Sequence, residues 1–168
     1  MLQARVATPV NICVSFLIAL ALVVGSFPST NQSQAARRRW SFKRVERCMM
    51  ERINRKRVRH GRSRLAWDRQ LGYVARVHAR KMARRRAIFH DGNLGDKITR
   101  WRRLADNVGA GRTCRRLFKA FWRSGPHRDN ILGPYRYMGV GAKRDGGQLF
   151  VQQIFEAKRD PGNIYSAP

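Results

Sequence analysis

Apolar residues recur at helical spacing along the chain from residue 42 onward. Positions 42, 45, 49 and 53 are apolar, and a spacing of three to four residues predicts a helix. The helix is expected to end near His60 and Gly61, because glycine readily adopts the left-handed conformation that closes a helix. Cys48 falls close to the same apolar face.

A second and clearer helical pattern follows Asp68, whose side chain is well suited to an N-cap. One stripe of positions along this helix is suited to burial, and arginines dominate the opposite face. The stripe consists of Leu71, Val74, Ala75, His78, Ala79 and Met82. The pattern therefore predicts a helix that packs one face against a core.

Residues 90–112 contain many glycines and turn-forming residues. They predict a long, ordered loop with a short strand around residues 105–108. Thr113 is expected to cap a third, amphipathic helix. The Gly125-Pro126 pair is expected to end that helix, and a further helical turn is expected to begin at Asp129 or Asn130.

The C-terminal part changes from helical spacing to strand-like alternation. Residues 135–143 and 148–156 predict two strands around Asp145-Gly146-Gly147, which is a strong signal for a hairpin. The predicted order is helix, helix, loop with a strand, helix and hairpin. This order predicts an α+β fold, in which helices pack on a small, mostly antiparallel sheet.

The N-terminus predicts export. Residues 12–25 form an apolar run that is too short for a comfortable membrane span, and the small-x-small pattern Ser33-Gln34-Ala35 follows it. Residues 1–36 are therefore interpreted as a signal peptide, with a cut after Ser26 or an uncleaved anchor as alternatives. A basic collar (37–42), one folded domain (43–157) and a loose tail (158–168) complete the predicted organisation. In each case the domain is expected outside the cytoplasm, secreted or anchored.

The charge adds a candidate partner. The chain has 36 Lys plus Arg and 10 Asp plus Glu, which gives a formal net charge of +26. An anionic partner would explain this excess: an envelope polymer, a lipid surface or nucleic acid. The alternative is a coding bias toward arginine with a solvated surface. Export and the lack of a recognised nucleic-acid module disfavour nucleic acid as the normal partner.

Cysteines suggest one covalent link. Cys13 lies in the predicted leader, so Cys48 and Cys114 remain as a pair in an exported domain, where disulfides persist. Two buried free thiols are the alternative. The chain contains no CxxC and no Cys/His zinc spacing, which argues against a structural zinc site.

The histidines supply the candidate chemistry. His60 is expected on the surface at a helix end, and His78 is expected in the core with a hydrogen bond. His90 and His127 each follow a helix, and Asp106 lies between them in the sequence. Two imidazoles and one carboxylate have the donor types for a divalent ion with positions left for water. A polar cluster satisfied by backbone groups is the alternative.

Seven segments in a characteristic order carry a resemblance to a known family. They are INRKRVRHGRSRLAWD, LGYVARVHARKMA, FH, ADNVGAG, FWRSGPHRDNIL, YMGVGA and FVQQIFE. Together they cover about residues 43–156, and this part of the chain resembles the CAP superfamily of cysteine-rich secretory, antigen 5 and pathogenesis-related proteins, also called SCP domains. The match is to the shorter bacterial branch. The resemblance implies a three-layer α-β-α sandwich.

The resemblance also implies a central surface cleft with two histidines and two acids. His90 and His127 match the histidines, and Asp106 stands where the family motif Gly-Glu-Asn-Ile has glutamate. That motif reads Ala-Asp-Asn-Val here, so only Asn107 is kept. Ser124 occupies the position of the second acid. The cluster is therefore reduced to two histidines and a shortened acid.

Two functions remain from these observations. The first is a secreted, monomeric and non-enzymatic module that needs no cofactor and binds a small ligand or an anionic envelope component. The alternative is a zinc-dependent hydrolase in which His90 and His127 ligate the ion and Asp106 is a ligand or base. No nucleophile–base pair and no HExxH motif are present to indicate proteolysis. Non-specific nucleic-acid binding is the least favoured function.

Overall fold

The computed structural model describes residues 43–158. The predicted leader (1–36), the basic collar (37–42) and all but the first residue of the predicted tail lie outside these residues. Those predictions therefore remain predictions. Among residues 43–158, no helix combines the length and the apolar character that crossing a membrane requires.

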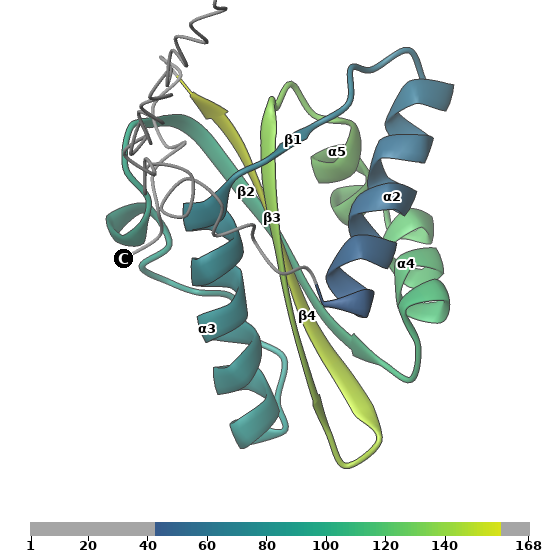
Figure 1. Cartoon of the computed structure of the whole chain (residues 1–168), viewed down its shortest axis with the longest axis vertical. Coiled ribbons are helices and arrows are strands. Elements are labelled where there is room, and N and C mark those ends of the chain that lie inside the picture. Colours follow the sequence, from purple (N-terminus) through teal and green to yellow (C-terminus); the bar gives the residue numbers. More distant parts are fainter. Residues whose placement is uncertain (1–42, 159–168) are drawn as a thin grey trace, which may run out of the picture. The chain divides into compact units, whose positions relative to one another are not determined.

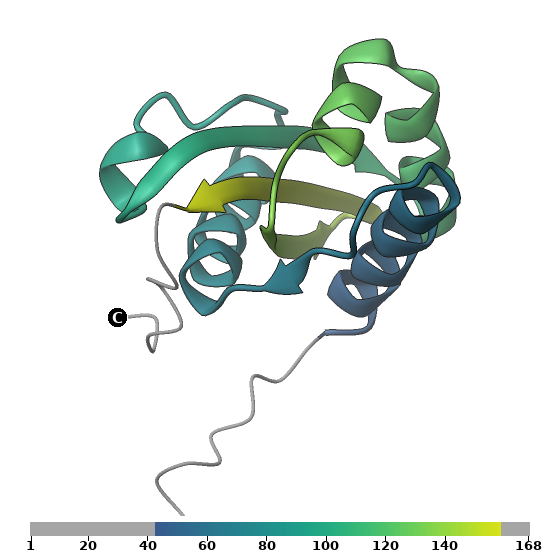
Figure 2. The same ribbon diagram turned by 90° about the horizontal axis from the view of Figure 1, so that it is seen from above.

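Helices cover both faces of a central sheet. Three helices lie on one face and one lies on the other, so that the domain has three layers (Figures 1 and 2). The first face carries α2 (Arg44–Arg59), α4 (Cys114–Arg123) and α5 (Gly125–Leu132), and the second carries α3 (Arg69–Arg85). This arrangement confirms the predicted α+β class and the α-β-α sandwich.

The sheet has four strands in the order β1-β3-β4-β2. The hairpin of β3 and β4 is antiparallel, β2 pairs antiparallel with β4, and only β1 runs parallel to its neighbour. The strands are β1 (Ala66–Trp67), β2 (Trp101–Gly111), β3 (Tyr137–Asp145) and β4 (Gln148–Lys158). The sheet is thus mostly antiparallel, as predicted, and two-residue β1 is too short for any sequence pattern to signal.

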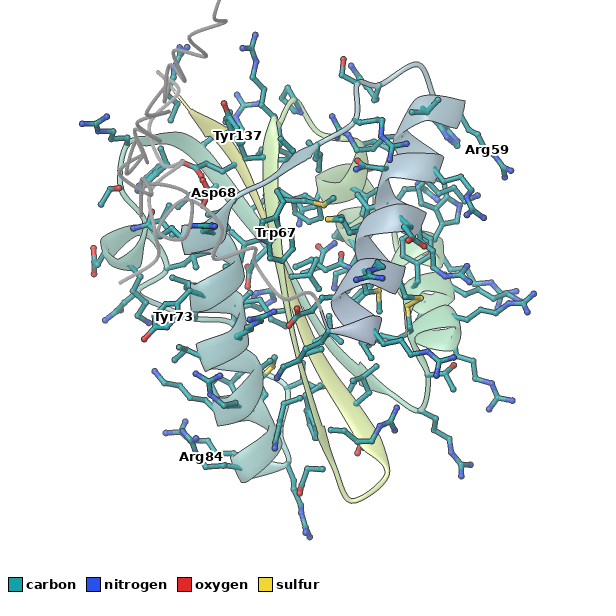
Figure 3. The ribbon with its side chains drawn as sticks, in the orientation of Figure 1. Arg59, Trp67, Asp68, Tyr73, Arg84 and Tyr137 are labelled. Carbon is teal, nitrogen blue, oxygen red and sulfur yellow. A yellow bond between two sulfur atoms is a disulfide. The ribbon has the colours of Figure 1, made fainter. Side chains whose placement is uncertain are left out.

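The predicted capping residues of two helices and the predicted turn of the hairpin are confirmed. Asp68 caps α3, since its Oδ1 accepts a hydrogen bond from the backbone N–H of Leu71 at 3.0 Å, and it lies at the start of that helix in Figure 3. Thr113 caps α4 in the same way. Gly146 and Gly147 both have positive φ, the geometry that a tight two-residue hairpin turn requires.

The strand predicted at residues 105–108 is much longer than expected. β2 pairs with β4 from Trp101, opposite Lys158, to Gly111, opposite Leu149, with a register shift between Trp101 and Arg103. A short 3₁₀ turn at Gly95–Lys97 precedes the strand. The glycine-rich and arginine-rich composition hides this strand from a propensity reading. Pairing with an apolar, buried neighbour therefore overrides the local preference for a loop.

The third helix ends directly before Gly125-Pro126, as predicted, but the expected start of the next helix is wrong. Ser124 ends α4 and also precedes α5, which begins at Gly125 itself rather than at Asp129 or Asn130. Proline is compatible with the first helical turn, because the backbone N–H that it lacks would have no partner within the helix there. His127 therefore lies in the first turn of a helix and not in a loop.

Close packing of α3 on the sheet fixes the segment that follows α3. A Cβ atom at Gly139 of β3 would lie 2.2 Å from the carbonyl carbon of Leu71, and one at Gly141 would lie 2.0 Å from that of Ala75. Only glycine at these positions lets the helix backbone rest directly on the strand. This contact positions the end of α3 and the residues that continue it toward His90.

Covalent and polar links hold the helices on the opposite face. A disulfide joins Cys48 of α2 to Cys114 of α4, with 6.5 Å between their Cα atoms, which confirms the predicted bond. The buried guanidinium of Arg57 donates hydrogen bonds to the carbonyl oxygens of Ser63, Ile131, Gly133 and Tyr135. The end of α2 is thereby tied to the end of α5.

Candidate functional site

Asp106 is the centre of the candidate site. It lies in the middle of edge strand β2, opposite Ile154 of β4. Its Oδ1 lies 2.9 Å from Nδ1 of His90, and its Oδ2 accepts a hydrogen bond from Nε2 of Gln152 at 2.9 Å. Both oxygens of this carboxylate are thus held by the protein. The structure brings together two of the predicted site residues, His90 and Asp106, and adds Gln152.

His90 is oriented but accessible. Its ring is 63% exposed, whereas the Asp106 side chain is 14% exposed. Because a carboxylate can only accept a hydrogen bond, Nδ1 of His90 must carry the proton in this contact. In the neutral ring, Nε2 is then left as an acceptor. The pair therefore presents an oriented imidazole at the surface.

A second polar network supports β2 from the side of α5. Asn107 donates to the backbone oxygen of His127 and to Oε1 of Gln153, each at 3.1 Å. Asn130 donates to the backbone oxygen of Asp106 at 3.2 Å and to Oδ1 of Asn107 at 2.9 Å. The first turn of α5 is consequently fixed to the strand that carries Asp106.

His127 lies near His90 and Asp106 without a hydrogen bond to either among the described residues. Its ring meets the edge of Phe121 with 5.1 Å between ring centroids, and its Nδ1 is buried without a partner in residues 43–158. Burial lowers the pKa of His127, and the nearby charge of His90 lowers it further against the opposing effect of Asp106. The fold thus favours a neutral ring.

Within residues 43–158, Ser124 makes no hydrogen bond to the cluster of His90, Asp106 and Gln152. It is half-buried at the junction of α4 and α5, where its backbone oxygen accepts from the N–H of Arg128 at 2.9 Å. Its local role is to connect two helices. The residue at the family's fourth position therefore contributes no acid to the cleft.

The donor set does not fit a resident zinc ion. Within residues 43–158, no three His, Cys, Asp or Glu side chains are grouped so that they could hold a metal. Both Asp106 oxygens already accept hydrogen bonds, which leaves the rings of His90 and His127. Two imidazoles are fewer than the three protein ligands that a catalytic zinc usually has.

The other two histidines have the roles expected of them. Nδ1 of exposed His60 lies 2.8 Å from the backbone oxygen of Lys56, at the end of α2. His78 is 2% exposed, and its Nε2 lies 2.7 Å from the backbone oxygen of Phe89. Both interpretations as structural residues are confirmed.

The sequence reading missed three amide side chains in the site: Gln152, Gln153 and Asn130. Gln152 and Gln153 are fully buried in β4, one directed toward Asp106 and the other toward Asn107. The signal was present, because two adjacent polar residues interrupt an otherwise apolar strand. Buried polar side chains need partners, so such a pair points to a polar network on each face of the sheet.

The family comparison agrees with this geometry. The model of the cysteine-rich secretory protein family, CAP, matches residues 50–155, more than half of the chain. No curated protein sequence is significantly similar to the sequence of this chain.

Solved structures show the same fold. An extracellular protein with an SCP domain from Bacillus anthracis matches at 26% identity and a TM-score of 0.61, over 68% of this chain and 40% of that chain. A cysteine-rich secretory protein from Staphylococcus aureus matches at 23% identity and 0.58, over 68% and 38%. An outer surface protein from Borrelia burgdorferi matches at 16% identity and 0.62, over 67% and 92%. This chain thus spans less than half of the Bacillus and Staphylococcus proteins.

Proposed function

The chain belongs to the cysteine-rich secretory protein (CAP) family, and from this premise we propose that it is a non-enzymatic binding module that acts outside the cytoplasm. Its ligand is a small molecule or an anionic component of the cell envelope. The cleft of His90, Asp106 and His127 and the basic surface of the domain make the contacts. The module acts as a monomer and needs no cofactor.

The observation that carries this proposal is the engagement of both carboxylate oxygens of Asp106. One oxygen is held by His90 and the other by Gln152, each at 2.9 Å. The carboxylate therefore orients an imidazole. Ser124, at the position of the family's second acid, supplies no further carboxylate. Without a second acid, and with no third metal ligand grouped nearby within residues 43–158, the oriented ring of His90 and the half-buried ring of His127 support recognition of a ligand.

The surface charge supports an anionic partner. The outer faces of the two disulfide-linked helices carry exposed basic side chains, which project from α2 and α4 in Figure 3. On α2 these include Arg44, Arg47, Arg55 and Arg59, and on α4 they include Arg115, Arg116, Lys119 and Arg123. Such a surface attracts polyanions over several ångströms in dilute salt.

An extracytoplasmic location has two supports. The disulfide between Cys48 and Cys114 is a bond typical of exported proteins. Two of the similar structures come from proteins described as extracellular and outer surface. The predicted signal peptide, residues 1–36, would deliver the domain there.

The zinc-dependent hydrolase has no comparable support, because the donor set of the cleft lacks a third protein ligand. Calorimetric titration with zinc separates the two functions. We expect no saturable heat for the wild-type protein. Saturable heat that disappears in a His90→Ala/His127→Ala double variant would favour the hydrolase instead.

Binding to isolated envelope fractions tests the proposal itself. We expect the protein to sediment with fractions that contain the anionic polymer and to stay in solution once that polymer has been extracted. Equal sedimentation with extracted and unextracted fractions would contradict an anionic ligand. Thin-layer analysis of the fractions after incubation should show no new products.

A further inference from the structure

A basic groove lies beside the candidate site, on the other side of His90. It has a volume of about 530 Å³ and is lined by the last turns of α3, by residues 89–93 and by Lys97. His90 belongs both to this groove and to the contact with Asp106. A volume of this size is typical of sites that hold a small ligand or one unit of a polymer.

The cations of this groove outnumber its acids. Lys81, Arg84, Arg85 and Lys97 line it, and Asp91 is the one acidic residue among its lining residues. Arg84 projects from the last turn of α3 (Figure 3). No ion pair of Lys81, Arg84 or Arg85 is found within residues 43–158. Three cations are thus available to an anionic ligand.

Asp91 does not cancel this charge, because it is committed to its own partners. Lys97 Nζ donates a hydrogen bond to Oδ1 of Asp91, and Nδ1 of His78 lies 3.8 Å from Oδ2. Burial raises the pKa of Asp91, but the hydrogen bond and charge of Lys97 and the charge of His78 outweigh burial and lower it. The carboxylate is therefore ionised and paired on the floor of the groove.

The groove is also ordered before any ligand arrives. Arg85 lies over the ring of Phe89 at 5.1 Å from its centroid, and His78 contacts that ring edge-on at 4.9 Å. Both contacts engage the ring of Phe89, which is therefore partly covered by protein groups. Guanidinium groups match the oxygens of phosphate in a bidentate manner, which suits a phosphate-bearing chain.

We propose that the groove formed by α3 and residues 89–97 binds one phosphate unit of a non-nucleic-acid phosphodiester polymer, through Lys81, Arg84 and Arg85. This inference rests on the proposed function and assigns it a site and a ligand chemistry. A concave groove receives a flexible chain, whereas a flat bilayer would contact only its rim. The polymer lies within reach of His90, which joins the groove to the cleft.

Affinity for a defined polymer tests the assignment. The probe is a synthetic poly(glycerol phosphate) chain, titrated at about 0.15 M salt, where exposed charges are screened over roughly 8 Å, into the wild type and into a Lys81→Gln/Arg84→Gln/Arg85→Gln variant. The matched control, Arg62→Gln/Arg64→Gln/Arg136→Gln, removes the same charge from exposed positions that line a different groove. Thermal unfolding establishes that each variant is folded, and a single Arg84→Gln variant provides a milder change.

We expect the groove variant to bind the polymer about 10-fold to 100-fold more weakly, because each cation near an anionic surface contributes roughly a few-fold or more to affinity. Arg84→Gln alone should fall between that variant and the wild type. The control should remain within about threefold of the wild type, since screening limits the reach of distant charges.

Other results would overturn the assignment in distinguishable ways. Equal weakening of both triple variants would place the binding on the general basic surface, so the groove would be wrong while the proposed function stood. No binding by the wild type would contradict the phosphodiester polymer as the ligand of the groove, while a small molecule or another envelope component would remain open to the proposed function. Two further probes of equal charge complete the test. A groove variant that loses binding to phosphatidylglycerol vesicles but keeps binding to the polymer would contradict a base-free polymer as the ligand. A wild type that binds a single-stranded oligonucleotide more tightly than the polymer would contradict it as well.

Discussion

His90 contacts Asp106 across 16 residues of sequence, with 2.9 Å between Nδ1 of the ring and Oδ1 of the carboxylate. One residue follows a helix on the α3 face, and the other lies in the edge strand of the sheet. The contact requires the proton of the neutral ring to reside on Nδ1.

The tautomer of His90 is therefore the first prediction. Long-range ¹H–¹⁵N correlation spectra of the neutral ring should show a protonated Nδ1 and an unprotonated Nε2. An Asp106→Ala variant should lose this preference, because the acceptor of the Nδ1 proton is gone, and thermal unfolding establishes that the variant is folded. An Nε2-protonated ring in the wild type would contradict the contact.

The second prediction concerns the packing of α3 on β3. Gly139→Ala and Gly141→Ala should each lower the free energy of unfolding by more than about 2 kcal/mol, because the added Cβ would overlap backbone atoms that cannot move separately. Urea denaturation measures the change.

Gly125→Ala is the matched control for these glycines. A Cβ at Gly125 would meet no atom within 4 Å, so its effect should stay within about 1 kcal/mol. Three equal effects would show that α3 does not rest directly on the strand.

The disulfide provides the third prediction. Cys48 and Cys114 are separated by 66 residues, and closing so long a loop should contribute about 4 kcal/mol through the entropy of the unfolded chain. Denaturation of the oxidised protein and of a Cys48→Ser/Cys114→Ser variant measures this difference. The intact mass should rise by two hydrogens on reduction, and an unchanged mass would refute the bond.

The fourth prediction is a loss of stability in mild acid through His127. Because the folded protein lowers the pKa of this ring, the unfolded chain binds the proton more tightly. Its contribution is complete above the ordinary histidine pKa of about 6.5 and is lost as the pH falls through the folded value. Urea denaturation between about pH 7.5 and pH 5 should show the decline.

A His127→Gln variant should have a flatter pH dependence than the wild type over this range. His60→Gln, which removes an exposed histidine at the end of α2, is the matched control for the loss of one imidazole. The same slope in the His127→Gln variant and the wild type would contradict a lowered pKa for that ring.

Most of the fold could be predicted from local signals. Capping residues such as Asp68 and Thr113 and the paired glycines of the hairpin define ends that depend on a few neighbouring atoms. The full length of β2 could not be predicted, because the stability of this strand comes from pairing with β4 rather than from its own composition. The Gly125-Pro126 pair does not indicate where the next helix begins, since proline is found both after the end of a helix and in its first turn.

The site was predictable in its residues but not in its contacts. The family resemblance selects His90, Asp106 and His127, yet spacing does not indicate that His90 contacts Asp106 while His127 packs on Phe121. The buried glutamines of β4 were visible in the sequence as polar residues within an apolar run. Which partner each one faces depends on strand alternation and on the register with β2.

The salt dependence of binding to anionic envelope polymer is the decisive measurement for the proposed function. The fraction of wild-type protein bound should be measured at constant polymer concentration from about 0.05 M to about 0.5 M sodium chloride. Exposed charges are screened more strongly over this range, so the affinity should fall at least about 10-fold. An affinity that is unchanged across the series would contradict electrostatic recognition of an anionic ligand.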